Sequence, residues 1–379
     1  MFVEAPSAPA GSVVAPGTRR APPAFGRPHS GRSARCRCHG QRAAIEPVAA
    51  EIAAFAPATI ANLGPGFDWL GCAVKGEGDT VVARPSTAEP CSVQIDKIEG
   101  EGGRLSLNAH KNCAGIAAIK ALELMGRTTC GVTLSLKKGL PLGSGMGSSA
   151  ASAAAGAMAV NLLFGSPLSK HELVIAGLAA ESVVSGYHAD NVAPALLGSF
   201  VLVRSYRPLE LHRLDFPNDL WFVLVTPVFE APTAKMRAAL PKLVPMPKVI
   251  NNCSMGAALV AAIVTGDPKL FGSSLNSDEI VEPVRGSLIP GFPAVKRAAL
   301  DAGAYGCTIG GAGPTAVAIV PGPEVGKEVA VAMQAAFKED GSLETANCQI
   351  VQLDKEGATM ATVPGVSQSL DVDVAAGRL

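Results

Sequence analysis

The sequence predicts an α+β protein whose body carries two domains. Its 379 residues are 48% hydrophobic and include 41 glycines, enough chain for two cores and many tight turns. Strand-like and helix-like segments alternate irregularly along the body, and no segment repeats at a fixed period. We therefore expect an N-terminal domain over residues 51–207 and a C-terminal domain over residues 208–379.

The first fifty residues differ in composition from the rest of the chain. They hold seven arginines against two acids, are rich in Ala, Pro, Gly and Ser, and lack the continuous apolar core of a secretory signal. This composition is typical of an organelle transit peptide, so residues 1–50 are predicted to be a disordered address segment. A disordered tail that stays in the cytosol is the alternative.

The composition of the body excludes several classes of function. Residues 51–379 carry 25 Lys and Arg against 30 Asp and Glu, and aromatic residues make up 4% of the chain, so nucleic-acid binding is disfavoured. The nine cysteines form no CxxC pair, and the six histidines show no metal-ligand spacing. No uninterrupted apolar run approaches the roughly 20 residues that span a bilayer, so no membrane partner is expected.

The elements follow from local periodicity. Short runs of alternating or β-branched residues predict strands at 52–55, 81–83, 93–95, 132–136, 198–204, 221–226 and 348–353. Apolar residues at helical spacing predict helices at 111–125, 149–164, 169–184, 233–240, 249–265, 293–302 and 324–337. Gly126 is expected to end the first helix, Ser169 to cap the third, residues 56–59 to form a loop, and the Gly-rich segment 308–320 to form a hairpin.

A glycine-rich segment lies between the strand at 132–136 and the Ala-rich helix at 149–164. Three alternating glycines let the main chain approach a ligand, and the following helix points unpaired amides at the loop, which favours a bound phosphate by about 1–2 kcal/mol. The spacing is neither a Walker A loop nor a Rossmann fingerprint, and a tight packing turn is the alternative. The residues predicted to bind the nucleotide are Pro141, Leu142, Gly143, Ser144, Gly145, Met146, Gly147, Ser148, Ser149, Ala150, Ala151 and Ser152.

This pattern, Pro-x-Gly-x-Gly-x-Gly-Ser-Ser-Ala, resembles the signature of the GHMP kinases, with Met146 where leucine is usual. Residues 56–68 and 308–315 resemble the opening and third motifs of that family, in the same order. The resemblance extends over residues 52–353. It implies the two-domain GHMP kinase fold, with a ribosomal-protein-like N-terminal domain, a ferredoxin-like C-terminal domain, and ATP and Mg²⁺ in the cleft between them. Members are often dimers, so a homodimer is expected, although no segment marks its interface.

Two segments discriminate within the family. The members that phosphorylate homoserine have similar sequences at two places, residues 185–194 and Glu282-Pro283-Val284-Arg285. The first of these segments resembles the sequence of the plant enzymes. The resemblance implies L-homoserine as the acceptor, O-phospho-L-homoserine as the product, and threonine biosynthesis as the setting. A plant-like body behind an acid-poor leader favours the chloroplast stroma as the location.

An amino-acid acceptor needs a cation for its carboxylate, an anion for its ammonium group, and polar groups that aim its hydroxyl. By the resemblance, Arg237 and Arg285 clamp the carboxylate and Asp68 holds the ammonium group. Asn62 and Asn191 orient the hydroxyl. Taken singly, such residues are more often surface charges or turn residues, and only their places in the motifs assign these roles.

The resemblance assigns the remaining site residues in the same way. His188 is expected near the substrate carboxylate and Thr233 near the transferred phosphoryl group. Glu181 and Ser148 are expected to complete the Mg²⁺ shell, because this hard ion takes few protein ligands beside water and phosphate oxygens. Asn112 is expected near the adenine.

Asp190 leaves two mechanisms open. The resemblance favours direct attack by the hydroxyl, aimed by Asn191, with the proton passing to phosphate or solvent; a general-base role for Asp190 is the alternative. Competing functions are another GHMP kinase, acting on mevalonate or a sugar, and a non-catalytic sensor of ATP and a metabolite. A serine hydrolase is excluded because Ser148 and Ser149 form no Gly-x-Ser-x-Gly elbow.

Overall fold

The computed structural model describes residues 44–184 and 186–362. Most of the predicted address segment, residues 1–43, lies outside these ranges. Residues 44–50 are described and already bond to the body: Ile45 N donates to Arg127 O at 2.9 Å, and Val48 N donates to Leu163 O at 2.8 Å. Residues 44–50 therefore contact the body, and the domain start at Glu51 expected from composition stays a prediction.

The first sheet has seven strands, in the order β11-β1-β2-β4-β3 with β5 paired to β2 and β6 paired to β5. Only β3 and β4 run parallel; the other pairs are antiparallel. The strands are β1 Ile52–Ala61, β2 Leu70–Ser86, β3 Val93–Glu99, β4 Gly131–Lys137, β5 Phe200–Tyr206, β6 Leu209–Leu214 and β11 Thr359–Met360.

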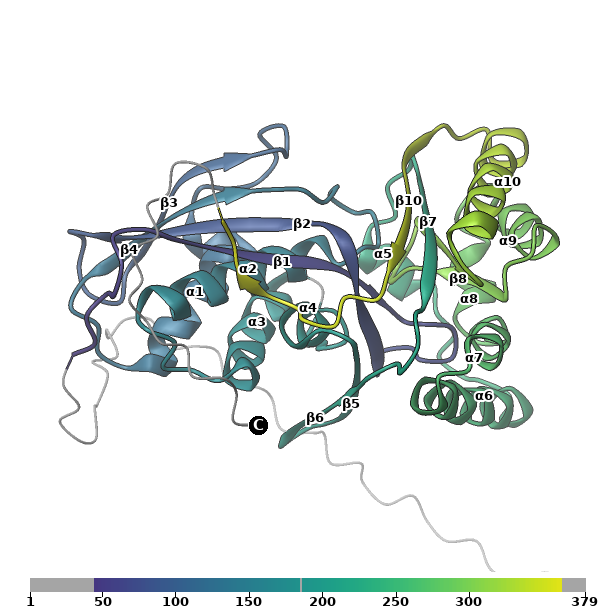
Figure 1. The fold of residues 1–379 in the computed structure, drawn as a ribbon, viewed down its shortest axis with the longest axis horizontal. Coiled ribbons are helices and arrows are strands. Elements are labelled where there is room, and N and C mark those ends of the chain that lie inside the picture. The colour runs from purple at the N-terminus through teal and green to yellow at the C-terminus, as the bar shows by residue number, and fades with distance from the viewer. Residues whose placement is uncertain (1–43, 185, 363–379) are drawn as a thin grey trace, which may run out of the picture. The chain divides into compact units, whose positions relative to one another are not determined.

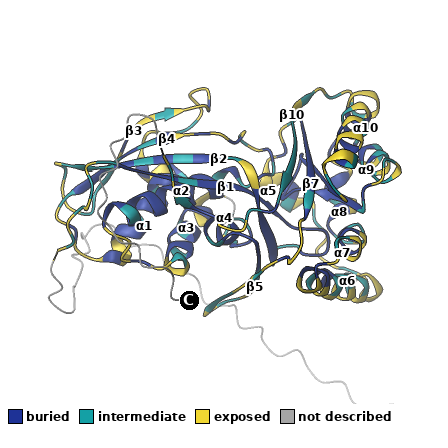
Figure 2. Cartoon of the chain, in the orientation of Figure 1, coloured by how far each residue is buried: buried dark blue, intermediate teal, exposed yellow. Residues whose placement is uncertain are grey.

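Helices gather on one face of β1 and β2 (Figure 1). They are α1 Cys113–Met125, preceded by the 3-10 helix η1 Ala109–Lys111, α2 Ser148–Leu163, α3 Lys170–Val184 and α4 Val192–Leu197. The Ala-rich sequence of α2 suits a central place, because small side chains let neighbours approach: a Cβ on Gly156 would lie 2.6 Å from Ala114 O on α1. Nearly every residue of α2 is buried, and Figure 2 shows this interior in dark blue.

The second sheet has four antiparallel strands in the order β10-β7-β9-β8. Its elements are β7 Trp221–Pro227, α5 Thr233–Ala238, α6 Met246–Thr265, α7 Pro268–Leu275, α8 Glu282–Gly286, α9 Phe292–Asp301, β8 Gly306–Ile309, β9 Ala316–Val320, α10 Pro323–Gly341 and β10 Thr345–Gln352. Alternate residues of β7 face opposite sides. Phe222 and Leu224 join the core of the first sheet, while Val223 and Val225 join a second core that includes residues of α9 and α10.

The predicted helices and strands are present, with shifted ends, so the α+β class is confirmed. The loop expected at 56–59 is wrong, because those residues belong to β1. The register shifts between Pro57 and Ala58, and such an irregularity lets a strand carry a proline that cannot donate to the ladder. The elements β6, β11, α4, α7 and α8 were not predicted from the sequence.

The domain boundary between residues 207 and 208 stays a prediction. It falls in the turn between β5 and β6, which pair with each other in the first sheet. One further helix bears on the expected absence of a membrane partner: in the described part of the chain, α6 is long and apolar enough to cross a bilayer. A single helix of this kind is weak evidence, because core helices meet the same test.

Candidate active site

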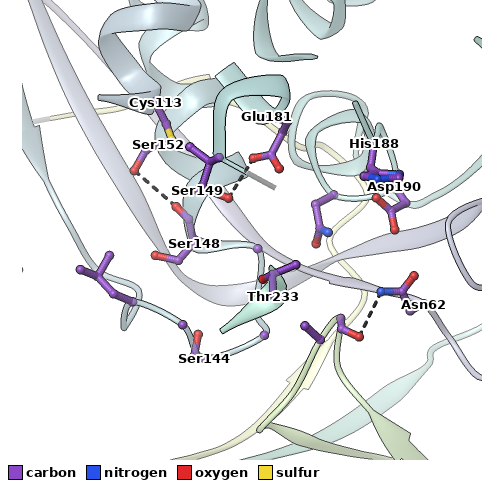
Figure 3. A pocket seen from close by; sticks show the side chains of 18 of the residues that line it. Asn62, Cys113, Ser144, Ser148, Ser149, Ser152, Glu181, His188, Asp190 and Thr233 are labelled. Atoms are coloured by element: carbon purple, nitrogen blue, oxygen red, sulfur yellow. Dashed lines mark hydrogen bonds between the residues drawn. The ribbon is translucent and has the colours of Figure 1, made fainter. Parts of the chain in front are cut away.

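A cavity of about 370 Å³ brings together most of the residues predicted for the site (Figure 3). The predicted residues that line it are Asn62, Asp68, Asn112, Leu142, Gly143, Ser144, Gly145, Gly147, Ser148, Ser149, Ser152, Glu181, His188, Asp190, Asn191, Thr233, Arg237 and Arg285. Four predicted nucleotide residues are not among the lining residues: Pro141, Met146, Ala150 and Ala151. Segments far apart in sequence thus form one site.

The glycine-rich loop joins β4 to α2 and needs its glycines. Gly143, Gly145 and Gly147 have φ values of 68°, 82° and 65°, in the region that side chains other than hydrogen disfavour. A Cβ on Gly145 would lie 2.4 Å from Gly310 O, so the third motif packs directly against this loop. Gly147 caps α2 without a side-chain hydrogen bond, which leaves the first-turn amides available to an anion.

Met146 explains why one loop residue does not face the cavity. Met146 is 1% exposed, and its sulfur lies 3.7 Å from Thr226 Oγ1 on β7. Thr226 in turn shares a 2.7 Å hydrogen bond with Thr315, whose hydroxyl donates to Ser144 O at 2.6 Å. These contacts fasten the loop to the second sheet.

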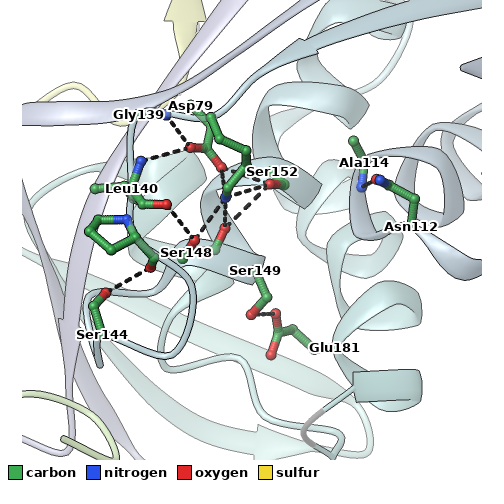
Figure 4. Close-up of polar contacts among 12 residues, drawn as sticks. Asp79, Asn112, Ala114, Gly139, Leu140, Ser144, Ser148, Ser149, Ser152 and Glu181 are labelled. Atoms are coloured by element: carbon green, nitrogen blue, oxygen red, sulfur yellow. Dashed lines mark hydrogen bonds and ion pairs between the residues drawn. The ribbon is translucent and has the colours of Figure 1, made fainter. Parts of the chain in front are cut away.

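A buried ion pair that was not predicted from the sequence joins the residue before the loop to the first turn of α2; Figure 4 shows Asp79, Ser148 and Ser152 of this network. Lys138 Nζ pairs with Asp79 and donates to Ser148 O and Ser148 Oγ at 2.8 Å and to Ser152 Oγ at 2.9 Å. Asp79 also accepts hydrogen bonds from the amides of Gly139 and Leu140 at 3.0 and 3.3 Å. Lys138 lines the cavity, and its place directly before a glycine-rich loop was the available sequence signal.

The donors at the start of α2 fit a magnesium ion. Glu181 on α3 is 4% exposed, and its Oε1 accepts a hydrogen bond from Ser149 Oγ at 2.8 Å, beside Ser148 (Figure 4). Within residues 44–184 and 186–362, no group of three or more His, Cys, Asp or Glu side chains forms a metal cluster. One carboxylate with hydroxyl oxygens is the sparse, hard set with which Mg²⁺ binds beside phosphates.

The far end of the cavity lies at the start of α1. Asn112 caps this helix: its Oδ1 accepts from Ala114 N at 3.0 Å and its Nδ2 donates to Ser106 O at 3.1 Å. Its amide is thus bonded within the protein, although it lines the cavity. Leu105, Lys111 and Cys113 line the same end and were not predicted.

The opposite end of the cavity holds the charged residues predicted for the substrate. Arg237 and Asp68 form a two-pronged ion pair, with Nη1 to Oδ2 at 2.8 Å and Nη2 to Oδ1 at 2.7 Å. His188 Nδ1 lies 3.6 Å from Asp68 Oδ1. Burial, and then the charges of Arg237 and Arg285, lower the pKa of His188, while the charge of Asp68 raises it.

Arg285 is the most deeply buried of these groups, with 0% of its surface exposed. Its Nη1 donates to Gly311 O at 3.0 Å, while its Nε and Nη2 have no hydrogen-bond partner. Burial, followed by the charge of Arg237, lowers its pKa to about 10. A buried guanidinium with free donors is an incomplete anion site, because such donors are costly to leave unpaired.

Asn62 links the first motif to the third. Its Nδ2 donates to Gly311 O at 3.0 Å, its Oδ1 accepts from Asp68 N at 2.9 Å, and Gly311 N donates to Ala61 O at 2.9 Å. Asn62 and Asp68 both have positive φ, 58° and 63°, a left-handed conformation that asparagine and aspartate adopt more readily than other side chains. In this structure the Asn62 amide therefore positions Asp68 and Gly311.

Asp190 and Asn191 lie between the phosphate loop and the charged end. Burial raises the pKa of Asp190 to about 7, with the charges of Asp68 and Glu181 adding to the shift. Asn191 Oδ1 accepts from Thr59 Oγ1 at 2.9 Å, and a Cβ on Gly147 would lie 1.9 Å from that hydroxyl. Asn191 and Thr59 therefore pack directly against Gly147 of the glycine-rich loop.

Comparison with known proteins identifies the class of protein to which this fold and site belong. The GHMP kinases N terminal domain matches residues 113–199, and the GHMP kinases C terminal domain matches residues 259–339. The mevalonate kinase of L. major, solved in complex with R-mevalonate, shares the fold at a TM-score of 0.63 and 16% identity, covering 83% of this chain and 99% of that one. The two-domain GHMP kinase fold expected from sequence is confirmed.

Relatives with higher sequence identity show which family within the GHMP kinases this chain belongs to. The chain is 54% identical to a homoserine kinase of Arabidopsis thaliana over 318 residues, which is 83% of this chain and 86% of the relative. It is 43% identical to a homoserine kinase of Chlorobaculum tepidum over 81% of this chain and 97% of that one. The crystal structure of homoserine kinase from Cytophaga hutchinsonii superposes with a TM-score of 0.78 at 39% identity, over 83% of this chain and 98% of that one. The chain belongs to the homoserine kinase family of ATP-dependent phosphotransferases.

Proposed function

We propose that this protein transfers the γ-phosphoryl group of ATP to the side-chain hydroxyl of L-homoserine, giving O-phospho-L-homoserine. The observation that carries the proposal is the composition of the single cavity described above. One end offers the free amides of α2 and the glycine-rich loop, and the other offers Arg237, Arg285 and Asp68. A nucleotide triphosphate and a zwitterionic alcohol fit these two ends.

The chain's own residues then divide the work of binding. The loop amides and the helix dipole hold the phosphates of ATP, and Lys138 keeps the start of α2 in place. Arg285, with its two free nitrogens, and Arg237 bind the substrate carboxylate, and Asp68 binds the ammonium group. His188 contributes to the same end, beside Asp68.

Magnesium fits the donors at the start of α2. Glu181 and the hydroxyl of Ser148 would hold the ion, with Ser149 hydrogen-bonded to the Glu181 carboxylate. When bound, Mg²⁺ neutralises phosphate charge during transfer. Thr233 lines the cavity at the N-terminus of α5, where we place it near the transferred group.

Transfer itself depends on positioning. Phosphoryl transfer passes through a loose transition state, so alignment and charge neutralisation supply most of the acceleration. Asn191 aims the substrate hydroxyl from a place fixed by Thr59, and the proton leaves to phosphate or solvent. Burial raises the pKa of Asp190 to about 7, close to neutral pH, which suits a general base, so transfer of the proton to Asp190 is the alternative route.

The test is an ADP-release assay with purified residues 44–379, ATP and Mg²⁺. L-homoserine should support turnover, while mevalonate and galactose should not exceed the substrate-free rate. Arg285→Lys should raise KM for homoserine about tenfold or more, since an ammonium group lacks the planar fork. No ADP release with homoserine, despite ATP binding, would contradict the assignment and favour a non-catalytic sensor.

We also propose that the protein is located in the plastid. The support is the arginine-rich, acid-poor segment before the body together with the likeness to a plant relative. Fusing residues 1–50 to a fluorescent protein should deliver it to chloroplasts, and a diffuse cytosolic signal would contradict this. The expected homodimer remains a prediction, to be measured by light scattering.

A further inference from the structure

The two side chains proposed to bind the ammonium group and the carboxylate of the substrate are bound to each other. Asp68 and Arg237 meet in the two-pronged ion pair at 2.7 and 2.8 Å, which is the geometry of a guanidinium holding a ligand carboxylate. Both side chains line the cavity and are partly exposed, 27% for Asp68 and 34% for Arg237. The Asp68 carboxylate thus occupies Arg237 where the substrate carboxylate would bind.

Arg285 lies beside this pair. The guanidinium carbons of Arg285 and Arg237 lie 4.9 and 5.2 Å from the centre of the Phe67 ring. Arg285 keeps Nε and Nη2 without partners, whereas Arg237 keeps only its Nε without one. One guanidinium is therefore open to an anion, and the other must first release Asp68.

The main chain of Asp68 is held while its side chain makes this pair. Asp68 N donates to Asn62 Oδ1 at 2.9 Å, and Asn62 Nδ2 donates to the Gly311 oxygen that also accepts from Arg285. These hydrogen bonds hold the main chain of Asp68 in place, so its carboxylate can move only by rotation of the side chain. Releasing Arg237 therefore calls for side-chain rotation rather than movement of the first motif.

We propose that the Asp68–Arg237 pair is exchanged for the substrate and thereby selects a zwitterion. This inference rests on the proposed function. When homoserine enters, its carboxylate replaces Asp68 on Arg237 and its ammonium group replaces Arg237 on Asp68, so every charge keeps a partner. A hydroxy acid without the ammonium group would leave Asp68 with only the His188 imidazole, 3.6 Å away, and an amino alcohol without the carboxylate would leave Arg237 without an anion. Stranding a charge in a partly buried site is unfavourable, so both are rejected.

The exchange makes a prediction that simple ammonium binding does not. Asp68→Asn removes the competitor for Arg237, so kcat/KM for 4-hydroxybutyrate, a hydroxy acid, should rise about tenfold above wild type. The same variant should lose about a hundredfold in kcat/KM for L-homoserine. The matched control, Asp68→Glu, retains the negative charge and should show no gain with 4-hydroxybutyrate.

A second variant, which removes Arg237 instead of Asp68, keeps the exchange testable if the Asp68 variant does not fold. Arg237→Met frees Asp68, so kcat/KM for 3-aminopropan-1-ol should rise about tenfold above wild type while that for homoserine falls. Thermal unfolding and KM for ATP show which variants are folded. If a folded variant shows no gain with its one-charge substrate, the exchange is overturned and the pair only binds. If wild type fails to phosphorylate homoserine at all, the proposed function fails instead.

Discussion

Replacing Lys138 by methionine is expected to destabilise the protein because it strands a buried carboxylate. The side chains of Lys138 and Asp79 are 1% and 0% exposed. Lys138 Nζ also donates to Ser148 and Ser152 at 2.8–2.9 Å. Methionine fills a similar volume without charge, so the main effect is the loss of the counter-charge and of these hydrogen bonds.

The magnitude follows from the surroundings of Asp79. Removing one partner of a buried ion pair costs about 3–5 kcal/mol. Asp79 keeps hydrogen bonds from the amides of Gly139 and Leu140 and from Ser152, which sets the expected loss near about 3 kcal/mol. An unfolding entropy of about 2.1 cal/mol/K per residue over roughly 320 residues converts this into a Tm lower by about 4–5 °C.

Thermal unfolding followed by circular dichroism at neutral pH measures the effect. Lys137→Met is the matched control, because this neighbour is exposed and should change stability by less than about 0.5 kcal/mol. The double variant Asp79→Asn/Lys138→Met should recover more than half of the loss, since a neutral side chain leaves no stranded charge. A Lys138→Met variant within about 1 °C of wild type, or a double variant whose losses add, would refute the reasoning.

Three further changes probe the site. Asp190→Asn should keep most of the turnover, and a loss beyond roughly a thousandfold in a folded variant would favour the base mechanism. Folding raises the pKa of Asp190 from 3.8 to about 7, so between about pH 4 and pH 7 the unfolded chain loses this proton before the folded chain does. The contribution of Asp190 to the free energy of unfolding therefore falls as the pH rises through this range. Urea unfolding should show the fall in wild type and not in Asp190→Asn. Glu181→Gln should lower kcat about 10²–10³-fold and raise the Mg²⁺ concentration for half-maximal rate, measured by ADP release; an unchanged Mg²⁺ curve contradicts its metal role. Gly147→Ala places a Cβ 1.9 Å from Thr59 Oγ1 at a φ of 65°, so calorimetry should show ATP binding weakened about tenfold or more; unchanged affinity contradicts the loop geometry.

Local signals account for what sequence analysis predicted well. The glycine-rich loop, the Ala-rich α2 and the capping of α3 by Ser169 each depend on a few neighbouring residues. Glu172 N donates to Ser169 Oγ at 3.3 Å, and Ser169 N donates to Glu172 Oε2 at 2.8 Å. Strands were predicted too short, because β2 continues through residues that only pairing with β1 and β4 makes extended. α7 was missed although Asp267 and Pro268 form a recognisable start, with Asp267 Oδ1 accepting from two amides.

The amino-acid sequence by itself determined the family, the order of the motifs and most of the residues that line the cavity, but not Leu105, Lys111, Cys113 or Lys138. Those depend on residue types at fixed short spacings, which a linear pattern records. Only the tertiary structure decided which residues of the site are hydrogen-bond and ion-pair partners: Asp79 with Lys138, Asn62 with Gly311, and Asp68 with Arg237. Such partners are tens to hundreds of residues apart, and a charged side chain chooses between solvent, substrate and a neighbour by burial and distance, which exist only once the chain is folded.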